Sequence, residues 1–79
     1  MPVIDRIGAW RVLFYANDHT PMHVHMILKG ENRGAKIWLE NISLAKNQML
    51  RPHEIKEALR MVESNKDKYK EVWHGFFGD

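Results

Sequence analysis

Hydrophobic and polar residues alternate along the first forty positions of the chain, a pattern typical of short β-strands. Between residues 10 and 15 the two faces carry Trp10, Val12 and Phe14 on one side and Arg11, Leu13 and Tyr15 on the other. Residues 22–28 (MHVHMIL) and 35–40 (AKIWLE) alternate in the same way, and residues 3–7 form a shorter run before a turn at residues 8–9. The pattern predicts an antiparallel sheet of three or four strands.

The second half of the chain changes to the spacing of an amphipathic helix. Its apolar residues recur at intervals of three, four and seven: Ile55, Leu59, Val62, Tyr69, Trp73 and Phe76. Pro52 suits the first helical position, although Arg51 before it is a poor N-cap. Ser64 and Asn65 are weak helix formers, so we expect a kink or a split into two helices near Asn65.

The simplest assembly of these elements is an α+β fold, a single domain of residues 1–79 with the C-terminal helix packed on one face of the sheet. The buried face is predicted to carry the more apolar rows: Met22, Val24, Met26 and Leu28 with Ala35, Ile37 and Leu39. The opposite face is then left without a covering layer.

Composition and charge exclude several classes of protein. The chain has no cysteine, which excludes disulfides and thiolate chemistry. Its longest apolar run, residues 12–16, is too short to cross a bilayer, and the charged N-terminus does not fit a secretory signal; we therefore expect a cytoplasmic protein. The net charge of +2 permits an RNA partner without requiring one.

Residues 16–26 (ANDHTPMHVHM) hold three histidines, His19, His23 and His25. By alternation, His23 and His25 fall on the uncovered face. The other residues predicted there are Lys36, Trp38, Glu40, Arg11 and Tyr15. Aromatic rings are unusual on a face selected only for solubility, so this face is the candidate functional surface.

Three interpretations of the histidines remain open. His23 and His25 stand at i and i+2 on one strand, close enough to share a divalent metal such as Zn²⁺ with His19 or Glu40 as third ligand. Alternatively, the pair supplies acid and base near neutral pH, with Arg11 or Lys36 stabilising developing negative charge, as in a small ribonuclease.

The third interpretation is non-catalytic. The histidines are then polar members of a strand or of the rim of a docking surface. The centre of that surface would be apolar and aromatic, built from Leu13, Ile27, Trp38 and Tyr15.

The ordered motifs "RIGAWRVLFYAND", "HTPMHVH", "AKIWLE" and "VWHGFF" resemble a family of small bacterial proteins catalogued as domain of unknown function 4160. The family motif falls on Arg6, His19, Pro21, His23, His25, Trp38, Glu40 and Trp73. Two positions depart from the family pattern: Met22 replaces a frequent proline, and Arg51 replaces a usual serine cap.

The resemblance implies a gene arrangement like that of toxin–antitoxin pairs. We therefore expect a toxin-like protein that acts on RNA or translation and has a small protein partner, with a homodimer as a further expectation. On this hypothesis His23, His25, His19 and Arg11 carry any chemistry. Contacts to the target are expected from Arg6, Tyr15, Lys36, Trp38 and Glu40.

Overall fold

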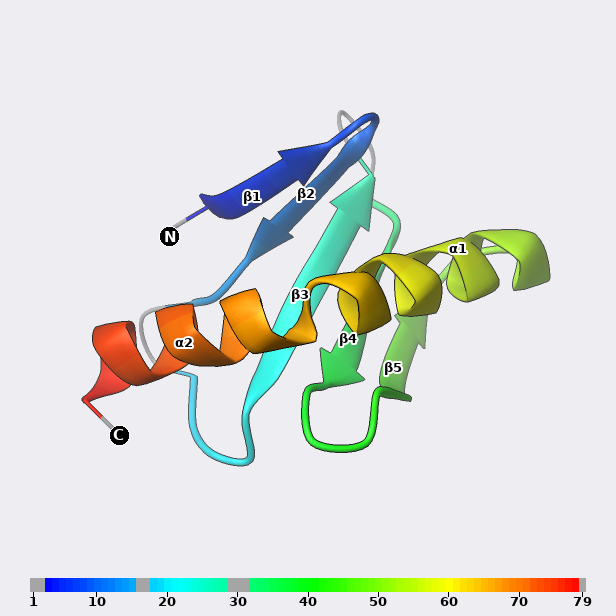
Figure 1. Ribbon diagram of the computed structural model, residues 1–79. Helices are drawn as coiled ribbons and strands as arrows, with labels where there is room; N and C mark the ends of the chain where they lie inside the picture. Colours follow the sequence, from blue (N-terminus) through cyan, green and yellow to red (C-terminus); the bar gives the residue numbers. More distant parts are fainter. Residues whose placement is uncertain (1–2, 16–17, 29–31, 79) are drawn as a thin grey trace.

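The computed structural model describes residues 3–15, 18–28 and 32–78, which form a five-stranded antiparallel sheet and two helices (Figure 1). The strands are β1 (Val3–Ile7), β2 (Trp10–Leu13), β3 (His23–Leu28), β4 (Gly34–Trp38) and β5 (Ser43–Gln48), and the helices are α1 (Pro52–Ser64) and α2 (Lys66–Phe77). The strands lie in the sheet in chain order, each paired with the next. The predicted α+β class is confirmed.

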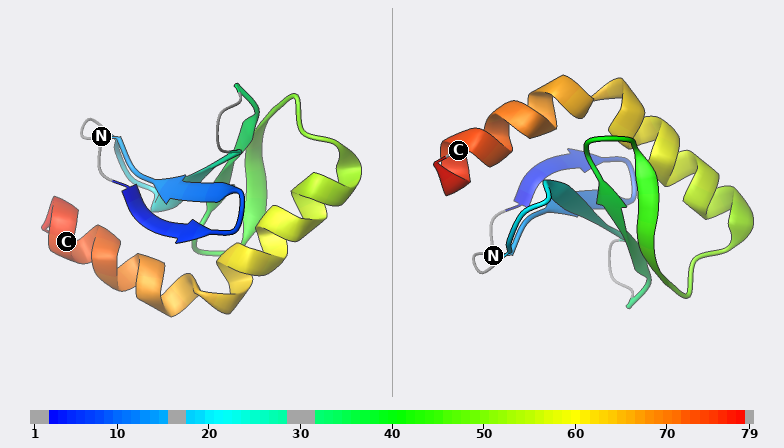
Figure 2. Two further views of the ribbon diagram at one scale, coloured as in Figure 1. Left: turned by 90° about the horizontal axis from the view of Figure 1, so that it is seen from above. Right: turned by 90° about the horizontal axis from the view of Figure 1, so that it is seen from below.

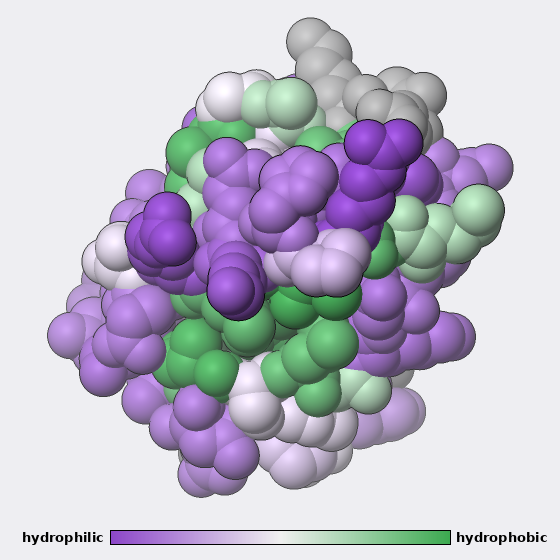
Figure 3. Space-filling model, turned by 90° about the vertical axis from the view of Figure 1, so that its right-hand side faces the viewer, coloured by the Kyte–Doolittle hydropathy of each residue, from purple (hydrophilic) through white to green (hydrophobic). Residues whose placement is uncertain are grey.

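The prediction of three or four strands is wrong in number, because β5 pairs with β4 at one edge of the sheet. Four of the six residues of β5 are exposed, and only Leu44 and Ala45 are apolar. An edge strand of this kind needs no buried face and carries little alternation. On the side of the molecule shown in Figure 3, hydrophilic residues cover much of the surface, and the most prominent hydrophobic area lies near its centre.

Both helices lie on the same face of the sheet, one after the other (Figure 2). The predicted split is confirmed: α1 ends at Ser64, and Asn65 separates it from α2. The side chain of Asn65 donates to the Met61 carbonyl oxygen at 2.9 Å, and its backbone N–H donates to the Val62 carbonyl oxygen at 3.2 Å. These bonds close the last turn of α1 and let the chain change direction.

Helix α1 begins at Pro52, as predicted. Arg51 is a poor N-cap, and the side chain of Glu54 in the first turn caps the helix start instead. The Glu54 carboxylate accepts from the backbone N–H of Arg51 at 2.8 Å and from Arg33 Nη1 at 2.7 Å. These donors lower the pKa of Glu54. The ion pair also ties the helix start to the segment before β4.

The core lies between the helices and the face of the sheet that alternation predicted to be buried. On the side of the sheet it is built from strand residues and from Phe14 and Leu39, which directly follow β2 and β4: Trp10, Val12, Phe14, Val24, Met26, Leu28, Ala35, Ile37 and Leu39. The helices contribute Ala58, Val62, Tyr69 and Trp73, and Ile55 and Leu59 pack against them, so the predicted apolar stripe points inward except at Phe76, which is exposed. No helix in the described part of the chain is long and apolar enough to span a membrane.

A polar contact joins α2 to the outer strand β1. The Tyr69 hydroxyl donates to Asp5 Oδ2 at 2.8 Å, and Lys68 Nζ lies 3.3 Å from the same oxygen. Partial burial opposes ionisation of Asp5, but Tyr69 and Lys68 outweigh it and hold the pKa of this carboxyl below its usual value.

We expect Asp5→Asn to lower the free energy of unfolding at pH 7 by about 1–2 kcal/mol, since the hydrogen bond from Tyr69 loses its charged acceptor. A lowered folded-state pKa stabilises the fold above the unfolded value near 3.8. That contribution is lost as the pH falls through the lower folded-state pKa. Urea unfolding at several pH values measures it, and the difference between the two proteins should shrink in acid. Glu40→Gln, an exposed turn residue, should change little at any pH.

Candidate functional site

The face of the sheet away from the helices is not covered by either of them (Figure 2). Residues that pair across neighbouring strands share a face, and the register therefore defines two rows here. The first row runs through Arg6, Arg11, Ile27, Gly34 and Gln48, and the second through Leu13, His25, Lys36 and Lys46. We call this surface the open face.

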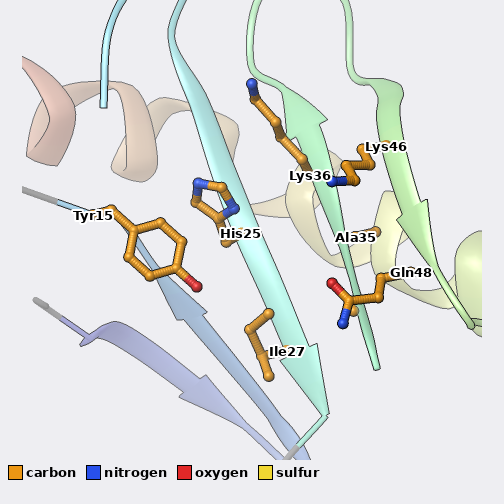
Figure 4. Close-up of a pocket in the computed structure, with 8 residues that line it drawn as sticks. Tyr15, His25, Ile27, Ala35, Lys36, Lys46 and Gln48 are labelled. Carbon is orange, nitrogen blue, oxygen red and sulfur yellow. The ribbon is translucent and has the colours of Figure 1, made fainter. Parts of the chain in front are cut away.

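Two adjoining hollows lie on the open face, with volumes of about 330 Å³ and 220 Å³. Both are lined by Tyr15, Ile27, Gly34 and Gln48, so together they form one groove. Figure 4 shows the Tyr15 ring beside His25, and Lys36 and Lys46 beside each other on the neighbouring strands. A Cβ at Gly34 would lie 2.5 Å from the Met26 carbonyl oxygen, so only glycine allows β3 and β4 to approach this closely.

The groove is rich in cationic side chains. Arg11, Arg33, Lys36 and Lys46 line it, and none of the described residues that line it is acidic. Arg33 is paired with Glu54, and Lys36 lies 4.7 Å from the centre of the Trp38 ring. Arg11 contributes a buried Nε with no hydrogen-bond partner among the described residues.

Asp18 closes one end of this face. Its Oδ2 accepts from the backbone N–H of Tyr15 at 2.9 Å, and its own N–H donates to the Tyr15 carbonyl oxygen at 3.0 Å. This closed loop directs the carboxylate at both strand histidines. His25 Nε2 lies 3.2 Å from Asp18 Oδ2, and His23 Nε2 lies 3.3 Å from Asp18 Oδ1.

His23 is buried at 2% exposure, which corrects its expected position on an exposed surface. Its ring packs against those of His25, Trp38 and Trp73 at centroid distances of 5.1, 5.7 and 5.2 Å. Trp73 comes from α2, so the helix end covers this corner of the sheet. The Pro21 carbonyl oxygen accepts from His23 Nδ1 at 2.8 Å, which assigns the proton to Nδ1 because a carbonyl oxygen can only accept.

The electrostatics of the cluster keep Asp18 ionised. Burial opposes its charge, but the Tyr15 N–H and the two histidines outweigh burial and lower the pKa of the carboxyl. Burial also dominates at His25: it lowers the pKa of the imidazole, although Asp18 acts in the opposite direction. His25 is therefore neutral near pH 7.

The structure brings together only part of the predicted set. His23 and His25 are adjacent, while His19 is exposed in the preceding loop and outside the cluster of donors. Asp18 takes the place expected for His19 or Glu40. Asp18, His23 and His25 each offer a donor atom, all within 4.8 Å of one another, and could hold a metal ion.

Three further expectations for the open face need correction or refinement. Strand β4 ends at Trp38, so Glu40 lies in the following turn and the alternation does not reach it. Leu13 is on the open face but is buried, and Trp38 is half-buried beneath Lys36. Arg6, for which no face was predicted, lies on this face directly opposite Arg11.

Sequence reasoning missed Asp18, Lys46 and Gln48. The strand that carries Lys46 and Gln48 was not predicted, so neither residue could be assigned to a face. Asp18 directly precedes His19 within the histidine-rich segment, and a carboxylate so close to three histidines was a usable signal.

A known family model matches the chain over residues 9–74. The chain belongs to the family described as Domain of unknown function (DUF4160). The matched segment contains the whole Asp18–His23–His25 cluster and Trp73, whereas Arg6 lies before it. No curated protein and no solved structure matches the chain.

Proposed function

We propose that this DUF4160 protein binds single-stranded RNA in the groove of its open face and acts as the toxin-like member of a pair whose small protein partner restrains it. The observation that carries the proposal is the charge of the groove: cationic side chains from β2, β4 and β5 line it without an acidic residue among its described lining. RNA is a polyanion, and its affinity for proteins comes largely from phosphate contacts.

Tyr15 gives the groove a place for a base. Its ring is 37% exposed and stands edge-on to the His25 ring at 4.5 Å, so its orientation is held by a neighbour. Flexible single strands can stack a base on such a ring while their phosphates follow nearby cations. Lys36 and Lys46 lie on adjacent paired positions, at the other side of His25 from Tyr15 (Figure 4).

The two rival hypotheses for the open face have less support. Acid–base catalysis by both histidines would require His23 to reach a substrate, and His23 is buried. A protein-docking surface centred on Leu13 and Trp38 would need both side chains to be accessible to a partner, but Leu13 is buried and Trp38 is half-buried. The cationic groove is therefore the accessible feature of the open face that best fits a binding function.

Replacing Lys36 and Lys46 with glutamine should weaken RNA binding and reduce its dependence on salt. Each phosphate contact with a single strand contributes roughly 0.7 to the slope of log K against log salt concentration, so loss of two contacts should lower the slope by about 1.4. Fluorescence anisotropy with a labelled, unstructured RNA of about ten nucleotides, measured between about 50 and 200 mM salt, gives both quantities.

The matched control is Lys56→Gln/Arg60→Gln, which removes the same charge from the exposed side of α1. It should bind RNA with the affinity and slope of the parent, apart from a small uniform effect of net charge. Equal losses in the two double variants would show that binding follows net charge alone. That result, or absence of binding by the parent at low salt, would contradict the proposal.

A further inference from the structure

We propose that Asp18, His23 and His25 form a binding site for one divalent transition-metal ion, with Zn²⁺ as the best-fitting occupant. This inference does not depend on RNA binding, because its test requires no nucleic acid. Two imidazole nitrogens and one carboxylate oxygen suit Zn²⁺ and its neighbours better than Mg²⁺ or Ca²⁺, which prefer oxygen ligands.

The distances between the donor atoms fit a tetrahedral ion. Ligands at about 2.0–2.1 Å from a tetrahedral centre lie roughly 3.3 Å from one another. Asp18 Oδ1 is 3.3 Å from His23 Nε2 and 3.4 Å from His25 Nε2. One carboxylate oxygen thus stands at the required separation from both imidazoles, and the two histidine donors lie no more than 4.8 Å apart.

His23 provides a second, independent argument. Its Nδ1–H donates to the Pro21 carbonyl oxygen, so Nε2 is the ring atom that is available to a ligand. That atom is buried and has no hydrogen-bond partner among the described residues, although Asp18 Oδ1 is 3.3 Å away. A cation placed between Nε2 and the Asp18 carboxylate would bind both atoms and would satisfy a buried nitrogen that otherwise has no partner.

The surroundings of the cluster are those of a prepared metal site. A ligating histidine usually donates its other ring N–H to a backbone carbonyl or carboxylate, as His23 does to Pro21. The Tyr15 N–H orients Asp18 in the same manner.

Three protein ligands leave a fourth position for water or another ligand. His25 is half-buried and also lines the groove, so this fourth position would lie close to it. For His25 to bind the metal as a neutral imidazole, its ring proton would move from Nε2, where Asp18 now accepts it, to Nδ1, which leaves the Nε2 lone pair for the metal.

Titration of the tag-free, metal-free full-length chain with Co²⁺ tests the site directly. Co²⁺ replaces Zn²⁺ in tetrahedral sites and gives visible absorption bands there. We expect bands that saturate at one Co²⁺ per chain and disappear when Zn²⁺ is added. Asp18→Asn and His25→Gln, which preserve side-chain size, should each weaken the Kd by at least about 100-fold, since loss of a ligand should exceed the effect of losing an outer-shell partner.

His19→Ala is the matched control, because His19 is an exposed histidine one residue from Asp18 and outside the cluster. It should bind Co²⁺ as the parent does. Circular dichroism must first show that each variant is folded, and His25→Gln alone suffices if Asp18→Asn does not fold. Absence of saturable bands in the parent, retained binding in His25→Gln, or loss of binding in His19→Ala would each overturn the proposal.

Discussion

Trp73→Ala is expected to lower the free energy of unfolding by about 3–5 kcal/mol, the usual cost of removing a buried tryptophan. Trp73 is 1% exposed, and its ring contacts those of Phe14, Phe77 and His23 at centroid distances of 5.1, 4.2 and 5.2 Å. A domain of this size has a total stability near the lower end of about 5–15 kcal/mol. The variant should therefore be partly unfolded at 37 °C.

Urea unfolding followed by far-UV circular dichroism measures the loss without relying on tryptophan fluorescence. Phe76→Ala removes a ring from the same helix, but Phe76 is 47% exposed and should cost less than about 1.5 kcal/mol. Equal losses in the two variants would mean that the end of α2 does not pack on the sheet as described. Because Trp73 also supports the His23 ring, Trp73→Ala should loosen the Asp18–His23–His25 cluster.

Alternation predicted correctly which side of β2, β3 and β4 meets the helices. Met26 and Ile37 are fully buried, and His25 and Lys36 pair on the opposite face, as their positions in the sequence require. Successive residues of a strand point to opposite faces of the sheet, so a buried row of residues fixes the face of all the others in that strand. The helix break at Asn65 was equally readable, since weak helix formers interrupt the apolar stripe there.

Alternation assigns a residue to one face of the sheet but does not show what packs over that face. For this reason the exposure of His23 was predicted wrongly. By alternation His23 belongs to the open face, yet its ring is covered by Trp73, which comes from a helix fifty residues later in the chain. The Asp18 contact is also tertiary: a loop held by the Tyr15 backbone returns the carboxylate to β3. Neither contact leaves a periodic signal in the sequence.

The groove depended on a strand that the sequence pattern does not reveal. β5 carries polar and charged residues on both faces because it lies at the edge, where neither face must be buried. Because β5 pairs with β4, Lys46 lies beside Lys36, and β5 residues form one wall of the groove. His25 belongs both to this groove and to the Asp18 cluster, so it links the proposed RNA site to the proposed metal site.

Tyr15→Ala is expected to abolish the growth arrest that the parent chain causes when it is expressed alone in a bacterial host. Stacking of a base on an aromatic ring contributes about 1–3 kcal/mol, so its loss should weaken RNA binding by roughly 5- to 150-fold. Tyr15 is exposed and lies outside the core, so the fold should survive the change. Culture density after induction and anisotropy with purified protein measure the two effects together.

Met49→Ala is the matched control, because Met49 is a large apolar residue that is 74% exposed and does not line the groove. It should arrest growth and bind RNA as the parent does. If Tyr15→Ala still arrested growth at equal expression although its RNA binding in vitro was weakened, the toxicity would not depend on RNA binding in the groove. Growth of cells containing abundant folded parent would contradict the toxin-like role while leaving RNA binding to be judged by its own salt dependence. Relief by Tyr15→Ala but not by Met49→Ala would place the toxic activity on the open face, since the two variants differ in which surface they change.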